Sequence, residues 1–235
     1  MPLPSNLRIT ETSRLSSSGT IVEPITLTDA KNFLKIPLAV TADDALVTDL
    51  ISDARTRCEQ AVSRTFVQAS YQMVFDTWPP FSASMGTLVA SILSTGTPFL
   101  YGGFNWEKYA VVFPFGPLIS VDSISYIDPG GNTVSLDPSP SANNVRIVAG
   151  TPGWMIPAFG KVFPITQPTI GNVTIDFTCG MITNPSLIGT LAPCVRSAIR
   201  YICGLLYFNR SGGLDLDDQT IRNLLAPVIT GATYV

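Results

Sequence analysis

The hydrophobic period of the sequence changes twice along the chain, and this feature constrains the fold more than any other. Apolar residues recur every three or four positions before residue 65, alternate with other residues from Val67 to Phe75, and return to helical spacing after residue 190. Because the two periods bury different kinds of face, they belong to different elements. The order predicts an α+β chain in which a β domain is inserted between helices that pack together.

Two helices are predicted before the β region. The first is short, with Thr28 as its N-cap and Pro37 after its end. The second begins at an N-cap, Thr41, with Asp44 at the capping-box spacing, and it runs to about Arg64. Its apolar stripe consists of Val47, Leu50, Ile51, Ala54, Cys58, Ala61 and Val62.

Two more helices are predicted after the β region. The longer one carries Pro193 in its first turn, and a shorter one follows over residues 217–225. The stripe of the longer helix needs an apolar partner, and we expect it to pack on the stripe of the helix that ends near Arg64. This second stripe consists of Val195, Ala198, Ile199, Ile202, Leu205 and Leu206.

Several short strands are predicted between the helices. The turn Asp128-Pro129-Gly130-Gly131-Asn132 predicts a β-hairpin, and a slip of the apolar phase near Asp122 predicts a bulge. The segment from Phe81 to Gly103 has no firm period and is expected to be a long loop. The expected strands are Val67 to Phe75, Ala110 to Phe113, Leu118 to Ile127, Thr133 to Leu136, Val145 with Ile147, Val162 with Phe163, and Val173 to Phe177.

The predicted fold is therefore a small bundle of about three to four helices with an inserted antiparallel β-sandwich or barrel-like domain. Residues 24–65 and 186–226 make up the helical domain, and residues 66–180 make up the β domain. Residues 1–23, rich in Ser, Thr and Pro, are expected to be an arm that is disordered alone or ordered only against a neighbour. Residues 227–235 are expected to be a C-terminal tail.

The composition excludes several classes of site. Fourteen Lys and Arg against 17 Asp and Glu give a net charge of −3, which argues against a general phosphate-binding surface. The chain has no histidine and no CxxC pair, so zinc-type ligand spacing is absent and we expect no metal or cofactor. We interpret the cysteines as reduced core residues; they are Cys58, Cys179, Cys194 and Cys203.

The sequence carries no evident export or membrane signal. The first 19 residues lack a continuous apolar region with a cleavage site, and no segment reaches the roughly 18 apolar residues of a membrane span. We therefore expect the chain to be made in the cytoplasm.

Catalysis is disfavoured because the acidic residues have structural explanations. A Ser-His-Asp triad is impossible without histidine, which leaves a hydrolase with paired carboxylates as the competing enzyme hypothesis. Asp43 and Asp44 are explained by helix capping, so no catalytic residue is predicted. The remaining acids are assigned to helix solubility (Asp49, Asp53 and Glu59) and to turns or strand ends (Asp122, Asp128 and Asp137).

A third class, a β-sandwich binding module, remains open. Trp106, Tyr109 and Trp154 could present aromatic faces to a carbohydrate or a host surface. Aromatic residues near Pro and Gly more often fix loops to a core, and a free-standing sandwich would not need the flanking helices. We therefore place this class second.

Four strings of the sequence, in their order, resemble the head-tail connector (adaptor) proteins of tailed double-stranded-DNA phages and related prophages. "ITLTDAKNFLKI" is similar to the opening helix of that family, and "DDALVTDLISDARTRCEQAVSRTF" is similar to its long second helix. "FPFGPLISVDSISYIDPGGNTVSL" resembles its hairpin, and "YFNR" followed by "NLLAP" resembles its closing helix and C-terminal signature.

The resemblance implies a structural virion protein, not an enzyme. Members of the family form a ring of about twelve copies beneath the portal protein, which extends the DNA channel and joins the head to the neck and tail. The implied partners are the portal, neighbouring copies, a stopper or tail-completion protein, and packaged DNA that passes without sequence-specific contact. The implied location is the neck of a virion made in a bacterial cytoplasm; another neck or tail-completion protein is the alternative.

Two groups of residues are candidate contacts in such an assembly. The C-terminal run has no charge and no evident partner within the chain, so we expect it to dock on the portal. Charged residues opposite the stripe of the second helix, where Asp53 and Arg57, and Arg55 and Glu59, have i, i+4 spacing, are candidates for pairing between subunits. The docking residues are Leu224, Leu225, Ala226, Pro227, Val228, Ile229, Tyr234 and Val235, and the inter-subunit residues are Arg55, Arg57, Glu59 and Arg64.

Overall fold

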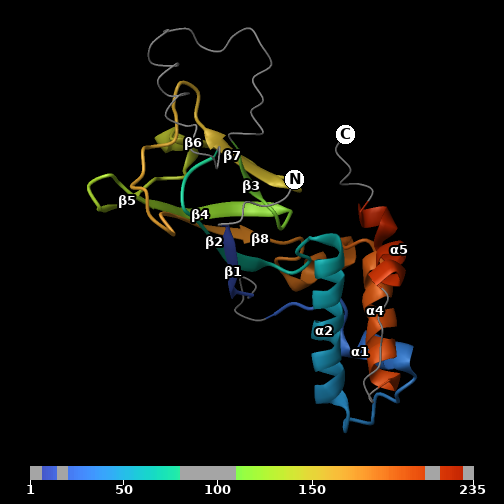
Figure 1. Ribbon diagram of the computed structural model, residues 1–235. Helices are drawn as coiled ribbons and strands as arrows, with labels where there is room; N and C mark the ends of the chain where they lie inside the picture. The colour runs from blue at the N-terminus through green and yellow to red at the C-terminus, as the bar shows by residue number, and fades with distance from the viewer. Residues whose placement is uncertain (1–6, 15–20, 80–109, 210–217, 230–235) are drawn as a thin grey trace. The chain divides into compact units, whose positions relative to one another are not determined.

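The computed structural model describes residues 7–14, 21–79, 110–209 and 218–229, and it confirms the predicted α+β class. The chain divides into two compact units (Figure 1). The β unit takes Met1–Thr12, Ser70–Phe113 and Leu118–Thr178, and the helical unit takes Ser13–Ala69, Pro114–Pro117 and Cys179–Val235. The two sheets are antiparallel and are not closed, so the barrel-like alternative is excluded.

Four α-helices lie in the described part of the helical unit. They are α1 (Leu27–Leu34), α2 (Asp44–Val62), α4 (Pro193–Phe208) and α5 (Asp218–Ile229), with a 3-10 helix at Pro185–Thr190. The apolar stripes of α2 and α4 pack on each other as predicted, and α1 and α5 each pack on both of them. The core is lined by side chains that include Val47, Ile51, Ala54, Cys58, Val195, Ala198, Ile199 and Ile202.

The ends of the helices differ from the predicted ends. The N-cap of α1 is Thr26, which forms a capping box with Asp29, and not Thr28. The N-cap of α2 is Asp43, without a side-chain cap bond, and not Thr41. The side chain of Asp44 instead forms an ion pair with Lys31 at 2.7 Å. The predicted position of Pro193, in the first turn of α4, is confirmed.

The β unit contains a five-stranded and a three-stranded sheet. The first sheet has the order β1-β2-β8-β4-β5, and the second has the order β3-β7-β6. The strands are β1 (Arg8–Ser13), β2 (Ala69–Phe75), β3 (Val111–Phe113), β4 (Leu118–Ile127), β5 (Thr133–Ser135), β6 (Val145–Val148), β7 (Gly153–Pro157) and β8 (Val173–Cys179), with a 3-10 helix at Pro140–Ala142. The predicted hairpin is confirmed by the pairing of β4 with β5.

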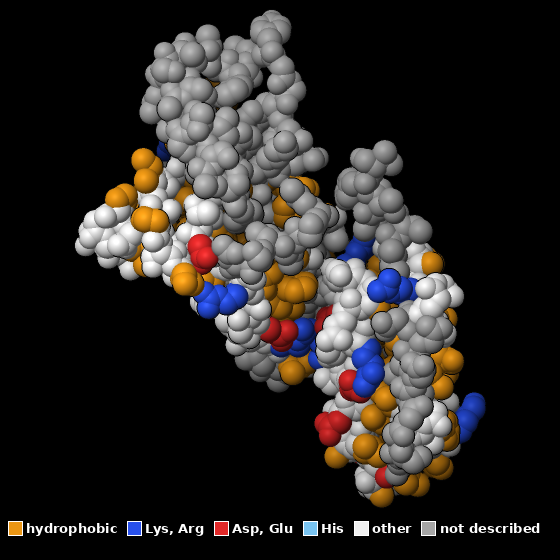
Figure 2. All heavy atoms as spheres, in the orientation of Figure 1, with side chains coloured by type: hydrophobic (Ala, Val, Ile, Leu, Met, Phe, Trp, Pro, Cys, Tyr) orange, Lys and Arg blue, Asp and Glu red, His pale blue; other side chains and the backbone are white. Residues whose placement is uncertain are grey.

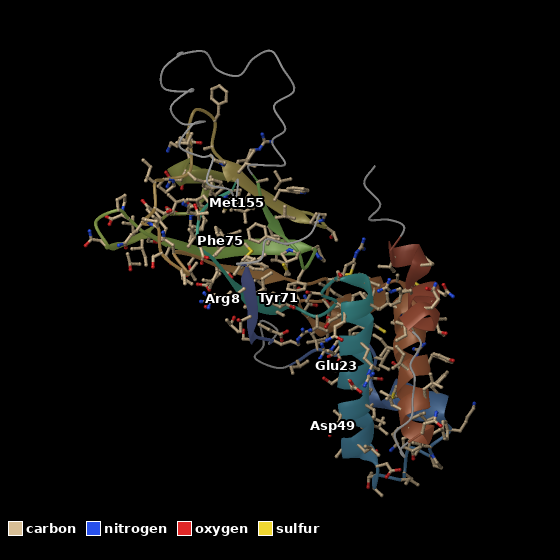
Figure 3. All side chains as sticks on the ribbon, viewed as in Figure 1. Arg8, Glu23, Asp49, Tyr71, Phe75 and Met155 are labelled. Atoms are coloured by element: carbon tan, nitrogen blue, oxygen red, sulfur yellow. The ribbon has the colours of Figure 1, made fainter. Side chains whose placement is uncertain are left out.

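Aromatic side chains fill much of the interior of the β unit. Alternate residues of β2, including Tyr71 and Phe75, are buried (Figure 3). The ring of Phe177 lies 5.6 Å from that of Tyr71 and 4.9 Å from that of Phe113, measured between centroids. These contacts show that the period-2 pattern of β2 and β8 marks a covered face, as expected.

Two expectations about the β unit need correction. The first 23 residues do not form only an arm, because β1 is an edge strand of the five-stranded sheet, and Thr12 Oγ1 donates to the carbonyl of Ser70 at 3.0 Å. Val162 and Phe163 do not lie in a strand. The structure also contains a strand that the sequence pattern does not predict, β7. In β4 the buried residues are Leu118, Val121 and Ile124, so burial follows the predicted slip of phase. The predicted loop from Phe81 to Gly103 lies outside the described residues.

Three chain segments bind one another in the helical unit, close to the points where the chain leaves it. The amide of Thr65 donates to the carbonyl of Gly116 at 3.1 Å, and the amide of Gly180 donates to that of Pro117 at 3.0 Å. Gly180 has a φ of 141°, and a Cβ there would lie 2.6 Å from the Cα of Gln68. Only glycine therefore allows the two backbones to approach so closely.

Candidate interaction sites

An ion-pair network covers one side of α2 in the helical unit. The guanidinium of Arg55 contacts Glu23 at 2.9 Å and Glu59 at 3.0 Å, and it also donates to Ser52 Oγ at 2.9 Å. A second guanidinium, from Arg14, contacts the same oxygen of Glu59 at 2.7 Å. The network therefore binds the N-terminal segment to α2; Glu23 is labelled in Figure 3.

The other carboxylate oxygen of Glu59 binds backbone. It accepts the amide hydrogens of Phe66 at 2.7 Å and Val67 at 3.3 Å. All contacts of this carboxylate are to groups of the same chain, and both of its oxygens are used. Glu59 thus fixes the segment that leads from α2 into β2, which is a structural role.

The predicted solvent exposure of Arg55 and Glu59 is wrong. Their exposed fractions are 3% and 7%, because residues far away in the sequence cover this side of the helix. Of the four predicted inter-subunit residues, Arg57 and Arg64 are the ones that are partly exposed. Arg57 binds both oxygens of Asp53 at 3.1 Å, in the predicted i, i+4 pair. A contact of any of the four with another subunit stays a prediction.

The C-terminal candidate segment does have a partner within the chain. α5 continues to Ile229, and Ile221, Leu225 and Val228 of this helix are buried in the core formed with α2 and α4. The expectation of an apolar run without an intrachain partner is therefore wrong, because its spacing gives it a helical face. Leu224 and Pro227 are exposed and Ala226 is half-buried. The side chain of Ile229, together with Tyr234 and Val235, lies outside the described part of the chain.

A buried lysine shapes an exposed apolar segment between α1 and α2. Lys31 Nζ donates to the carbonyls of Leu38 at 3.2 Å and Val40 at 2.5 Å, and it pairs with Asp44 at 2.7 Å. Residues 36–42 carry no charge, and the side chains of Leu38 and Val40 are exposed. Figure 2 shows hydrophobic side chains gathered at this end of the helical unit. No pattern in the sequence indicates this use of Lys31.

A second exposed apolar surface lies in the β unit, between β7 and β8. Its base is held by Phe163, whose ring stacks on that of Trp78 with centroids 4.4 Å apart and planes 4° apart. The exposed side chains of this loop are Phe159, Val162, Ile165 and Ile170. The loop thus exposes four apolar side chains while Phe163 fixes it to the aromatic core of the β unit.

The acidic residues of the five-stranded sheet have hydrogen-bond donors on neighbouring strands. Asp176 accepts from Gln72 at 3.0 Å and from Ser123 at 2.7 Å. Asp122 accepts from Thr178 at 2.7 Å. Neutral donors thus satisfy these carboxylates, as in a structural polar face. Within the described ranges no group of three or more His, Cys, Asp or Glu could hold a metal ion.

The turn acids have the structural role expected of them. Asp128 accepts the amide hydrogen of Asn132 at 2.9 Å, and this bond, with a further one from the side chain of Asn132, lowers the pKa of Asp128 below its ordinary value. Bonds from the backbone and the side chain of Ser139 likewise lower the pKa of Asp137. Both carboxylates are thus stabilised in their charged form by their own turns.

Of the aromatic residues proposed for carbohydrate binding, Trp154 is the one that the structure describes. Trp154 is half-buried in β7, and Trp106 and Tyr109 lie outside the described residues. Trp78, which was not a candidate, is fully buried among Phe75, Tyr126 and Phe163.

The cysteines fit the interpretation of reduced core residues. All four are free thiols; Cys58, Cys179 and Cys203 are buried and Cys194 is half-buried. Burial, with the nearby charge of Glu59, raises the pKa of Cys58 to about 12. Of the helices in the described ranges, none is both long enough and apolar enough to cross a membrane.

Three solved structures resemble this chain over nearly its whole length. No family model and no curated protein sequence matches it. A chain from the neck of an empty gene transfer agent (GTA) particle, computed with C6 symmetry, matches with a TM-score of 0.62 and 16% sequence identity. The match covers 94% of each chain. A chain from the neck of the native GTA particle, computed with C12 symmetry, matches with a TM-score of 0.60 and 16% sequence identity. This match covers 94% of our chain and 93% of the other chain. A chain from the virion of a native GTA particle matches with a TM-score of 0.57 and 15% sequence identity, over 92% of our chain and 93% of the other chain. At these identities the chain shares a fold with those structures.

Proposed function

We propose that this chain is a structural protein of the neck of a phage-like particle, a head-tail connector (adaptor) that forms a ring beneath the portal. The observation that carries the proposal is the match of both units, over 94% of this chain, to a chain of a particle neck. The family resemblance of the helical strings and the hairpin points in the same direction. A ring of about twelve copies accords with the C12 symmetry used for one of the similar necks.

A structural role also accords with the chemistry of the acidic residues. Glu59, Asp122 and Asp176 are all occupied by donors of the same chain, and the described residues offer no metal cluster. The proposed role is structural. The proposed partners are neighbouring copies, the portal, a stopper or tail-completion protein, and DNA that passes through the channel without specific contact.

Portal docking is proposed for the exposed part of the C-terminal segment. Leu225 and Val228 belong to the core, so a contact with the portal falls to Leu224, Pro227 and the residues after α5. Deletion of residues 230–235 keeps the buried residues of α5 and should leave a folded protein. The deletion variant should weaken attachment to portal-containing heads, whereas attachment at the wild-type level would refute docking by the residues after α5.

The proposed function is tested by the mass of the assemblies that the purified full chain forms, alone and with isolated portal. We expect rings, visible by negative-stain electron microscopy, and a portal complex of defined copy number. Retention on glycan columns is measured in parallel, because it tests the binding-module alternative. A monomer that forms no ring and binds no portal at any concentration tested would overturn the proposal, and glycan retention would then favour the alternative.

A further inference from the structure

Two acids on α2 and two arginines on α4, none of them fully buried, have matching spacing in the helical unit. On α2, Asp49 is exposed on the edge turned away from α4 (Figure 3), and Asp53 follows one turn later. On α4, the only charged residues are Arg196 and Arg200, also one turn apart. Two acids and two arginines therefore have the same i, i+4 spacing on different helices.

Most of these charges have no partner within the described part of the chain. Among the residues that the structure describes, neither Arg196 nor Arg200 contacts a carboxylate, and Asp49 accepts no hydrogen bond. The Nε of Arg196 is even buried without a hydrogen-bond partner. Asp53 is bound by Arg57, but both side chains of that pair are more than 40% exposed. Within the described residues, Asp49 and Arg200 therefore remain available for ionic contacts with another copy, as do the nitrogens of Arg196 other than the buried Nε.

The two pairs lie at matching heights along the bundle. The hydroxyl of Tyr207 donates to Asp43 at 2.6 Å, so the end of α4 lies beside the start of α2 and the helices are antiparallel. At about 1.5 Å per residue, Asp49 lies about 9 Å along α2 from Asp43, and Arg200 lies about 10.5 Å along α4 from Tyr207. The same count gives about 15 Å for Asp53 and about 16.5 Å for Arg196. Each acid is thus level with one arginine to within about one turn.

We propose that Asp49 and Asp53 of one copy pair with Arg200 and Arg196 of the next copy in a ring. This inference rests on the proposed function, because it needs a cyclic assembly. Rotation about a ring axis moves a copy sideways without shifting it along the axis, so groups that are level in one chain stay level between neighbours if the bundle follows that axis. The contact joins two different faces, which is the heterologous type that closes into rings.

Charge reversal with a compensating swap tests the pairing. Asp49→Lys and Arg200→Glu should each weaken association of the full chain about tenfold, because each replaces an attraction by a repulsion. The double variant should recover association to within about threefold of the wild type. Gln60→Lys on α2 and Arg222→Glu on α5 are matched controls, since both positions are exposed and neither belongs to the proposed contact. Association is measured by sedimentation at low and high salt, and circular dichroism checks the fold.

Disulfide trapping gives a second, independent measurement. Asp49→Cys and Arg200→Cys are combined in a Cys194→Ser background, which removes the one native thiol that is not buried. A head-to-tail contact should give a ladder of covalent oligomers under oxidation, whereas a two-fold contact could give dimers only. Gln60→Cys with Arg200→Cys is the control, because Gln60 lies about 16 Å further along α2 than Asp49.

The outcomes separate this inference from the proposed function. If the wild type forms rings but the cysteine pair gives no ladder, or if the double reversal fails to recover association, the pairing is overturned and the connector proposal stands. If the wild type forms no ring with or without portal, the connector proposal fails and the pairing fails with it. A ladder together with recovery by the double reversal supports the pairing.

Discussion

Replacement of Glu59 by glutamine tests how much the buried network of α2 stabilises the helical unit. The amide oxygen of glutamine can still accept the hydrogen bond from the amide of Phe66, so the change removes mainly the negative charge. Arg55, which is 3% exposed, then keeps only Glu23 as an ionic partner, and Arg14 loses the carboxylate that it contacts. Removal of one partner from a buried ion pair costs about 3–5 kcal/mol, and we expect about 3 kcal/mol here because Glu23 remains.

The same helix provides a matched control. Asp53→Asn makes the same acid-to-amide change in another i, i+4 pair with arginine, but the side chains of Asp53 and Arg57 are 44% and 41% exposed. Exposed pairs of this kind contribute about 0.3–0.5 kcal/mol, so Asp53→Asn should change stability very little.

Urea unfolding followed by circular dichroism at 222 nm is the assay, because this signal reports mainly the helical unit. Glu59→Gln should lower the free energy of unfolding by about 3 kcal/mol and Asp53→Asn by less than about 0.5 kcal/mol. If the two variants differ by less than about 1 kcal/mol, burial does not set the strength of this network and the reasoning is refuted.

Three further predictions concern other parts of the chain. Lys31→Met should raise hydrogen exchange of residues 36–42 at least about tenfold, because two carbonyls lose their donor; unchanged exchange there would contradict this. Trp78→Ala should cost about 3–5 kcal/mol and Phe159→Ala almost nothing in urea unfolding, since Trp78 is fully buried and Phe159 fully exposed; equal costs would be contrary evidence. The raised pKa of Cys58 keeps its thiol neutral in the folded state, whereas the thiol of the unfolded chain ionises near pH 9.0. The contribution of the neutral thiol to folding stability is therefore complete below pH 9.0 and is lost as the pH rises toward 12. Over that window the wild type should lose more stability than Cys58→Ala, and parallel losses would count against the assignment.

The stripes of α2 and α4 could be predicted because the information is local. A helical face repeats every 3.6 residues, so Val47, Ile51, Val195 and Ile199 identify their own faces without knowledge of the rest of the chain. The alternation in β2 and the turn at Asp128 are local in the same sense. These elements, and with them the α+β class, followed directly from the sequence.

The environment of α2 could not be predicted in the same way. Arg55 and Glu59 stand at positions that a helical wheel marks as exposed, and they are buried because Arg14, Glu23 and Phe66 reach them from outside the helix. Such contacts depend on how distant segments pack together, and the hydrophobic period of a segment reports only its own secondary structure. A charge pair at i, i+4 can therefore be solvated or buried with the same sequence signature.

Two other misassignments have the same physical origin. β1 is polar and lies at a sheet edge, where ladder hydrogen bonds with β2 hold a strand that has no apolar alternation of its own. The run from Leu224 to Ile229 belongs to a helix that starts earlier, at Asp218, and its buried face includes Ile221. That face packs on α2 and α4, which are distant in the sequence. Both segments owe their order to partners rather than to their own pattern.

The chain passes between the helical unit and the β unit at five places, after residues 12, 69, 113, 117 and 178. Close to the crossings after residues 69, 113, 117 and 178, hydrogen bonds join the backbone of Thr65 to Gly116 and that of Gly180 to Pro117. A pulling force between the units would therefore be divided among five covalent strands in parallel, and one broken peptide bond would not separate them. For a protein proposed to lie between a DNA-filled head and a tail, this connectivity provides mechanical redundancy that a single linker could not.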